Sequence, residues 1–191
     1  MKYSKVYQFK ITLKDTRPPV WRRIQVPETF TFWDLHCAIQ DAMGWLDMHL
    51  HAFRIFNPKI GIKSEIGMPD PEFEFDRNTL PGWKQHISKW FTPVNSRAAY
   101  MYDFGDGWDH QIDLEKILPC EAGVKYPCCI AGKRACPPED CGGTYVYREI
   151  CNGKPEHRKE YPDFDPDDFN PEEIVFSDSR KRLRVLLSDD M

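Results

Sequence analysis

The sequence of 191 residues has no run of 18 apolar residues, so no segment has the length of a membrane-spanning helix. It also shows no secretory signal-peptide stretch and no internal repeat. Four enzyme signatures are missing as well: the Walker phosphate loop, the dinucleotide fingerprint, the nucleophile elbow and the His-Glu-x-x-His zinc helix. We therefore expect a cytoplasmic protein with no membrane partner, and we favour a protein that is not an enzyme.

The chain has little excess charge of either sign. Its 26 Lys and Arg residues against 30 Asp and Glu residues give a net charge of −4. Mild acidity argues against a protein that binds nucleic acid with its whole surface. The charge is unevenly distributed, however, because residues 1–25 carry seven basic residues and one acidic residue. One basic face is therefore compatible with the negative total.

The N-terminal half has clear periodic patterns. Residues 3–13 alternate between apolar and polar side chains, and residues 20–26 form a second such segment after a proline turn, which predicts an antiparallel hairpin. Thr31 is a good N-cap for an amphipathic helix that Gly44 ends. Residues 49–56 again resemble a strand. This strand-strand-helix-strand start predicts an α+β fold with a mixed, mainly antiparallel sheet.

The C-terminal half contains a second predicted hairpin, residues 99–104 and 110–117, followed by a loop region rich in Cys, Pro and Gly. Helices are predicted for residues 144–151 and after Ser179. Between them, residues 154–173 hold eight acidic and three basic residues with four prolines, which indicates an acidic surface arm. We expect a core domain over residues 1–153. The remainder, 154–191, is expected to pack on that same domain as an arm with a terminal helix.

The turn of the second hairpin carries a cluster of possible metal ligands. Asp103, Asp106 and Asp109 recur at three-residue intervals, and His110 follows. Carboxylate oxygens and an imidazole nitrogen suit a divalent metal. Gly and Asp also supply the positive φ and local hydrogen bonds of an ordinary hairpin turn, and this structural interpretation is the favoured one.

His49 and His51 form a second candidate site. Residues two apart in a strand share a face, so both rings could point at one metal or substrate. Phe53 and Ile55 fall on that same face, which supports the alternative that the histidines are buried and hydrogen-bonded.

Cysteines form the third candidate site, since six of the seven lie between Cys120 and Cys151. Cys129, Cys136 and Cys141 could converge on zinc, with His110 or His51 as the fourth ligand. No Cys-x-x-Cys knuckle supports this, so a redox-active pair and buried thiols in a tight turn stay open.

The fourth candidate site is a contact for nucleic acid. Trp21, Arg22 and Arg23 place two guanidinium groups beside an aromatic ring, which could hold a phosphate backbone or a stacked base. The alternative is an amphipathic strand that uses these side chains to cover the sheet.

Five segments combine most of these residues in a recognisable order. They are Pro18–Ile24, Leu35–Trp45, His49–Phe53, Tyr102–His110 and Cys129–Gly143. Taken together, they resemble the plasmid pRiA4b ORF-3-like family. The resemblance implies a compact α+β domain, a broad prokaryotic distribution and an association of some relatives with mobile elements. It implies no established reaction, and it marks the motif residues as site candidates only.

Three functions follow as hypotheses. The leading one is a binding module without enzymatic activity, stabilised by zinc and associated with plasmid or mobile-element DNA. The rival is a metal-dependent hydrolase that uses a cluster of five residues. They are His49, His51, Asp103, Asp106 and His110. In the third, every cluster serves the fold, and the functional surface lies elsewhere.

Overall fold

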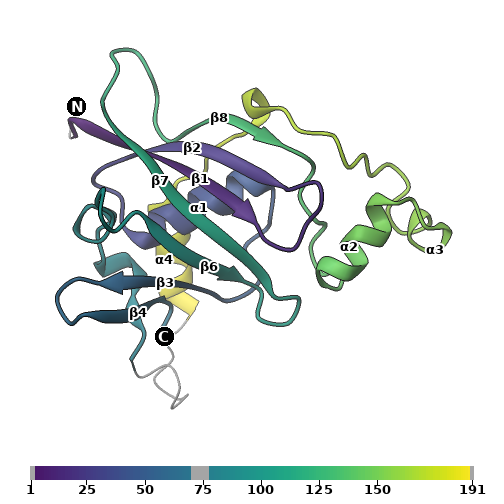
Figure 1. Ribbon diagram of the computed structural model, residues 1–191, viewed down its shortest axis with the longest axis horizontal. Coiled ribbons are helices and arrows are strands. Elements are labelled where there is room, and N and C mark those ends of the chain that lie inside the picture. The colour runs from purple at the N-terminus through teal and green to yellow at the C-terminus, as the bar shows by residue number, and fades with distance from the viewer. Residues whose placement is uncertain (1–2, 70–77, 190–191) are drawn as a thin grey trace.

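The computed structural model describes residues 3–69 and 78–189, and its main element is one eight-stranded sheet (Figure 1). The strand order is β5-β4-β3-β6-β7-β1-β2-β8, and only the β4–β5 pair is parallel. The strands are β1 (Lys5–Leu13), β2 (Trp21–Pro27), β3 (His51–Asn57), β4 (Ile62–Gly67), β5 (Leu80–Pro81), β6 (Arg97–Tyr102), β7 (Trp108–Pro119) and β8 (Cys128–Lys133). The predicted mixed, mainly antiparallel α+β fold is confirmed.

Both predicted hairpins form. β1 pairs antiparallel with β2, and β6 pairs antiparallel with β7, which also lies beside β1 in the middle of the sheet. Phe9, Ile11 and Leu13 are two residues apart, so they share one face of β1, and all three are buried in the core.

Helix α1 (Phe32–Met43) has the ends that the sequence predicts. The Thr31 side chain accepts a hydrogen bond from the Asp34 amide, while an Asp34 carboxylate oxygen accepts one from the Thr31 amide at 2.8 Å. This reciprocal pair is a capping box. Gly44 ends the helix at φ 98°, where a side chain would be strained. The apolar face of α1 packs against the sheet.

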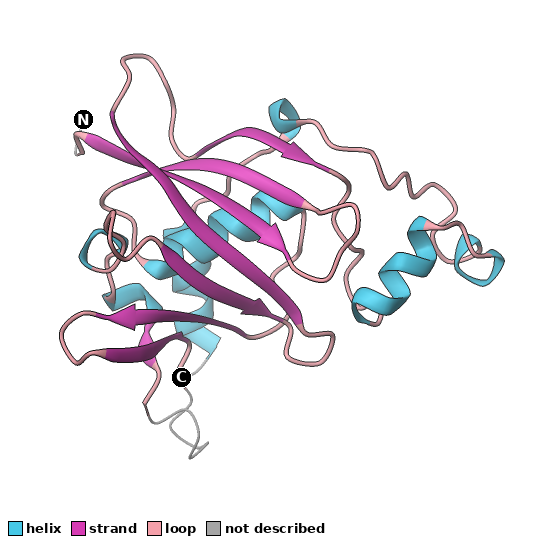
Figure 2. Ribbon diagram, viewed as in Figure 1, coloured by secondary structure: helices cyan, strands magenta, loops and turns pink. Residues whose placement is uncertain are grey.

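The C-terminal half supplies the remaining helices: α2 (Gly143–Cys151), α3 (Pro155–Arg158) and α4 (Ser179–Asp189). Within residues 3–69 and 78–189 there are also three 3₁₀ turns: η2 (Gly82–Lys84), η3 (Ile87–Lys89) and η4 (Pro171–Glu173). Figure 2 shows α1 and α4 behind the same face of the sheet, whereas α2 and α3 lie beyond its end. Among the described residues, no helix is both long and apolar enough to span a membrane.

The structure corrects the sequence-based assignment at three strands. β3 begins at His51, so His49 precedes the strand instead of sharing its face. The edge strand β8 occupies part of the predicted Cys/Pro/Gly-rich loop, and β4 lies in a segment whose prolines and glycines hid its pattern. The acidic arm contacts the core through backbone and side chains, as where the Ala135 amide donates to the Pro166 carbonyl.

Candidate functional site

Three loops meet at a group of possible metal ligands, which we call the loop cluster: His49, Asp103 and Asp140. One ligand atom of each residue lies within 4.8 Å of the other two. His49 Nε2 is 2.8 Å from Asp140 Oδ1 and 3.8 Å from Asp103 Oδ2. The side chains of His49 and Asp140 are 31% and 60% exposed, so solvent reaches the cluster.

Local geometry aims Asp103 at His49. Asp103 is the first residue of the turn between β6 and β7, and its backbone has φ 53°. Oδ1 accepts hydrogen bonds from the amides of Gly105 (2.9 Å) and Asp106 (3.3 Å), which leaves Oδ2 directed at the imidazole. Asp and Gly tolerate such turns because a short side chain can hydrogen-bond to the neighbouring backbone. The turn predicted as the structural alternative therefore also forms one wall of the site.

Asp106 holds two of the loops together. Its Oδ2 accepts a hydrogen bond from the Gly142 amide at 2.9 Å, just before α2. Gly143 follows at φ 81°, and a Cβ atom there would lie 3.0 Å from the Asp106 carbonyl oxygen. The close approach requires glycine. Asp106 thus positions the loop that carries Asp140, and it lies outside the clusters of three ligands found among the described residues.

His49 and His51, which the sequence pattern places in one candidate site, lie in two different parts of the structure. His51 is 4% exposed, and its ring stacks on His36 with 3.5 Å between ring centroids and 7° between planes. His49 is in the loop cluster instead. The prediction of a shared face is wrong because the strand starts at His51.

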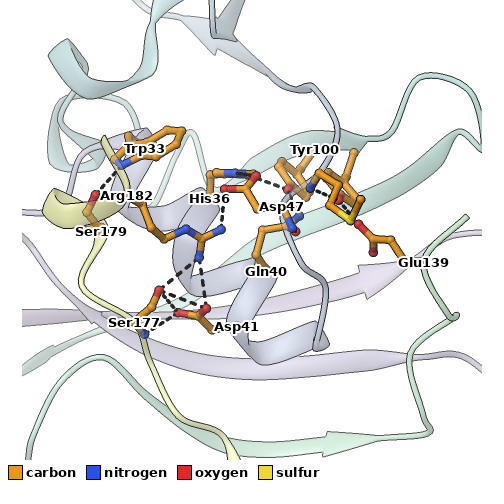
Figure 3. A network of polar contacts seen from close by, with 12 residues as sticks. Trp33, His36, Gln40, Asp41, Asp47, Tyr100, Glu139, Ser177, Ser179 and Arg182 are labelled. Atoms are coloured by element: carbon orange, nitrogen blue, oxygen red, sulfur yellow. Dashed lines mark hydrogen bonds and ion pairs between the residues drawn. The ribbon is translucent and has the colours of Figure 1, made fainter. Parts of the chain in front are cut away.

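His36 belongs to a buried polar network with Asp47 that Figure 3 shows from close by. Its Nδ1 is 2.9 Å from the Tyr100 hydroxyl, and its Nε2 is 2.7 Å from Asp47 Oδ1. Burial lowers the pKa of His36 and lowers that of His51 further. Burial alone would raise the pKa of Asp47, but hydrogen bonds from His36 and Arg182 hold it below its usual value.

This buried group has the composition of a metal site, since ligand atoms of His36, Asp47 and His51 also lie within 4.8 Å of one another. Its geometry argues against one. An imidazole binds a metal in its own plane, and two parallel rings stacked at 3.5 Å cannot direct their lone pairs at one ion. Asp47 is also occupied by His36 and Arg182. We interpret the group as a structural network.

A third group, Glu149, Glu156 and His157, meets the same distance criterion beside α2 and α3. Glu149 already forms an ion pair with Lys154, and its Oε2 lies 3.3 Å from His157 Nε2. Ion pairing therefore explains its arrangement without a metal.

Sequence reasoning missed His36 as a functional or structural centre. The sequence did contain a signal, because His36 and Gln40 are polar residues at positions on the apolar stripe of α1. In the structure both are fully buried. Polar residues at such positions need partners inside the fold. Here both bond to the Tyr100 hydroxyl.

The network also fastens α4 to α1. Arg182 bonds to Asp41 and Asp47, and the Trp33 indole donates to the Ser179 carbonyl at 2.8 Å.

We expect Arg182→Ala to reduce the free energy of unfolding by about 1–3 kcal/mol, because it leaves two partly buried carboxylates without their cation. Urea unfolding and the rate of subtilisin cleavage near the C-terminus measure the effect.

Arg184→Ala is the matched control, since Arg184 is exposed on the same helix. Equal stability of the two variants would contradict an anchoring role for Arg182.

Of the predicted nucleic-acid contacts, Trp21 and Arg23 lie at the surface and Arg22 lies in the interior. Arg22 is 2% exposed, and its guanidinium donates to the Ala42 carbonyl at 2.8 Å and to those of Trp21 and Lys133. Arg23 forms an ion pair with Glu115 at 2.6 Å and keeps a 28% exposed side chain. Of the three predicted contact residues, Trp21 and Arg23 are therefore the two that a nucleic acid could reach in this conformation, and binding itself stays a prediction.

Comparisons with known proteins identify the family. The chain matches the plasmid pRiA4b ORF-3-like protein family over residues 5–176. It belongs to this family. The uncharacterized protein y4hQ of Sinorhizobium fredii (strain NBRC 101917 / NGR234) is 33% identical over 149 residues, which cover 78% of this chain and 72% of that protein.

A solved structure shares the fold. The crystal structure of the protein of unknown function MM3350 from Methanosarcina mazei Go1 has a TM-score of 0.84 and 43% sequence identity. The match covers 92% of this chain and all of that one. The span matched by the pRiA4b ORF-3-like family includes all three loop-cluster residues and ends before α4.

In this family member, no two cysteines of the described residues are joined by a disulfide. Cys129 lies in β8, Cys136 follows it in a loop, and Cys141 is buried just before α2. Burial raises the pKa of all three thiols, to about 12 for Cys141. In the part of the chain that the structure describes, no cysteine belongs to a cluster of three close ligands. Zinc at these cysteines stays a prediction.

His110 is completely buried between aromatic rings. Its Nδ1 is 2.9 Å from the Trp108 carbonyl, whereas Nε2 has no hydrogen-bond partner among the described residues. Burial lowers the pKa of His110 to about 4, so the ring is neutral at pH 7. It is not part of a three-ligand cluster within residues 3–69 and 78–189.

Proposed function

We propose that this protein is a metal-binding module whose divalent cation is held by His49, Asp103 and Asp140. The observation that carries the proposal is the approach of their ligand atoms to within 4.8 Å at a point that solvent reaches. One imidazole nitrogen and two carboxylate oxygens suit first-row divalent metals such as Mn²⁺, Fe²⁺ and Zn²⁺.

Three protein ligands leave coordination positions for water or for a partner molecule. Such an open site can either recruit an anionic ligand or activate water, as in metal-dependent hydrolases. Of the five residues in the hydrolase hypothesis, only His49 and Asp103 lie in the loop cluster. Asp106 positions a loop and the other two are buried, so the geometry favours binding over catalysis.

An ion pair is the simplest competing explanation. Protonated His49 would attract both carboxylates, and the 2.8 Å contact with Asp140 would merely fasten the loop before α2. Exposed pairs of this kind contribute about 0–1 kcal/mol to stability. The two explanations differ in whether an added metal ion binds.

The test is isothermal titration of chelator-treated protein with ZnCl₂ and MnCl₂, together with metal analysis by plasma mass spectrometry. We expect about one ion per chain and at least about 10-fold weaker binding in His49→Ala, which removes a ligand, and in Asp140→Asn, which removes the negative charge of one. His86→Ala is the matched control, because His86 is exposed and lies outside the clusters found in the described residues.

Cys136→Ser and Cys141→Ser separate this proposal from the cysteine zinc site. Loss of the metal in the cysteine variants, with full binding in His49→Ala, would place the ion at the cysteines and overturn the loop-cluster proposal. Unchanged binding in His49→Ala and Asp140→Asn would do the same. Association with plasmid or mobile-element DNA is a separate proposal that rests on Trp21 and Arg23.

A further inference from the structure

We propose that a cavity beside α2 binds a small phosphorylated molecule through Arg17, Arg134 and Arg148. The cavity has a volume of about 700 Å³, within the range of about 300–1,000 Å³ typical of small-molecule sites. Its walls are the turn between β1 and β2, one side of α2, and the acidic arm near Asp167. None of these three arginines belongs to the loop cluster.

Arg134 supplies a buried guanidinium with unused donors. The residue is 9% exposed, and its Nη1 is 2.8 Å from Asp167 Oδ1. Its Nε is buried without a hydrogen-bond partner among the described residues. Because this Nε is shielded from solvent, a ligand in the cavity would meet the outer guanidinium nitrogens of Arg134, which carry four of its five N–H donors.

Arg17 and Arg148 are exposed on opposite walls of the same cavity, one on the β1–β2 turn and one on α2. Of the three lining arginines, only Arg134 has a carboxylate partner within the described part of the chain. The two lining carboxylates are Asp15 and Asp167, and the second is already paired. The cavity therefore has an excess of unpaired positive charge.

The chemistry of these groups favours a phosphate. A guanidinium presents parallel N–H donors that match two oxygens of a phosphate group, and several such groups around one cavity suit a doubly charged anion. The first turn of α2 adds Thr144 and Tyr145 to the lining, and both residue types carry a hydroxyl group that can donate a hydrogen bond to a phosphate oxygen.

The size of the cavity argues for more than free phosphate. Tyr145, Asn152 and Cys151 also line it, so an organic group attached to the phosphate would meet an aromatic ring and polar side chains. A concave site of this volume fits a phosphate monoester or a mononucleotide. The proposed ligand is therefore a small phosphate ester and not a duplex, whose phosphates lie on a convex surface.

The test is isothermal titration of the full chain with AMP, glucose 6-phosphate and inorganic phosphate, with adenosine and glucose as the uncharged counterparts. We expect the phosphate esters to bind and the uncharged compounds not to bind. Arg17→Ala and Arg148→Ala should each weaken the binding at least about 10-fold, since each removes a bidentate contact. Lys84→Ala, which removes an exposed cation outside the cavity, should have no effect.

Circular dichroism of each variant checks folding, and both arginines are exposed enough to be replaced without loss of the core. Failure of all three phosphate compounds to bind at millimolar concentration would overturn the proposal. So would binding that is unchanged in both arginine variants. Binding of only an oligonucleotide duplex, weakened by the same substitutions, would also overturn it in favour of a nucleic-acid surface.

Discussion

Replacing Arg22 by alanine is expected to reduce the free energy of unfolding by about 3–5 kcal/mol, because three backbone carbonyls lose a charged donor, at about 1–3 kcal/mol for each acceptor left without a partner. The Arg22 guanidinium bonds to carbonyls of Trp21, Ala42 and Lys133, and it lies 3.9 Å from the centre of the Phe169 ring. It therefore joins β2, β8, the end of α1 and the acidic arm.

Urea unfolding of Arg22→Ala and Arg23→Ala measures the difference. We expect Arg23→Ala to cost less than about 1 kcal/mol, because its ion pair with Glu115 is partly exposed. Arg22→Met is the matched variant that retains an apolar side chain of similar length, and it should lose less stability than Arg22→Ala. Equal stability of the Arg22→Ala and Arg23→Ala proteins would contradict a structural role for Arg22.

The same pair of variants bears on nucleic-acid binding. If β2 contacts DNA, Arg23→Ala should weaken binding of a labelled duplex at low salt while leaving the fold intact. A steep fall of affinity with rising salt would support phosphate contacts. Absence of binding at low salt would remove DNA from the list of partners.

Lowering the pH from about 6.5 to about 4 is expected to reduce the free energy of unfolding by about 3 kcal/mol through His110 alone. Burial lowers the pKa of His110 from 6.5 to about 4 in the folded protein. In this interval the unfolded chain binds a proton that the folded protein does not bind. Stability is therefore full above about pH 6.5 and falls as the pH approaches 4.

Two other buried histidines act in the same direction, since burial also lowers the pKa of His36 and of His51. The depressed pKa of Asp47 adds a further loss once the pH falls below the ordinary value of an aspartate, because the unfolded chain then binds a proton that the folded protein does not bind. Urea unfolding at several pH values from about 7.5 to about 3 measures the total slope.

His110→Asn isolates the contribution of one ring. Asparagine retains a donor for the Trp108 carbonyl but cannot be protonated in this range, so the variant should show a shallower pH dependence. His86→Asn, an exposed position, should leave the slope unchanged. A His110→Asn slope equal to that of the unmodified protein would show that this ring does not contribute.

Local patterns determined much of the fold. The capping box of Thr31 and Asp34, the glycine that ends α1 and both hairpins were predictable because each depends on a few consecutive residues. The burial of Arg22 was also present in the sequence. Arg22 lies two residues before Ile24 and four before Val26, so it shares their buried face of β2.

Tertiary structure alone decided which possible ligands come together. His49 was grouped with His51 by spacing, but the start of β3 separates them and brings His49 to Asp140, 91 residues away in the chain. Likewise, the arginines of the proposed phosphate cavity come from a turn, a loop and a helix. The physical reason is that periodicity and capping act within one element, whereas a site depends on how the sheet places the loops between its strands.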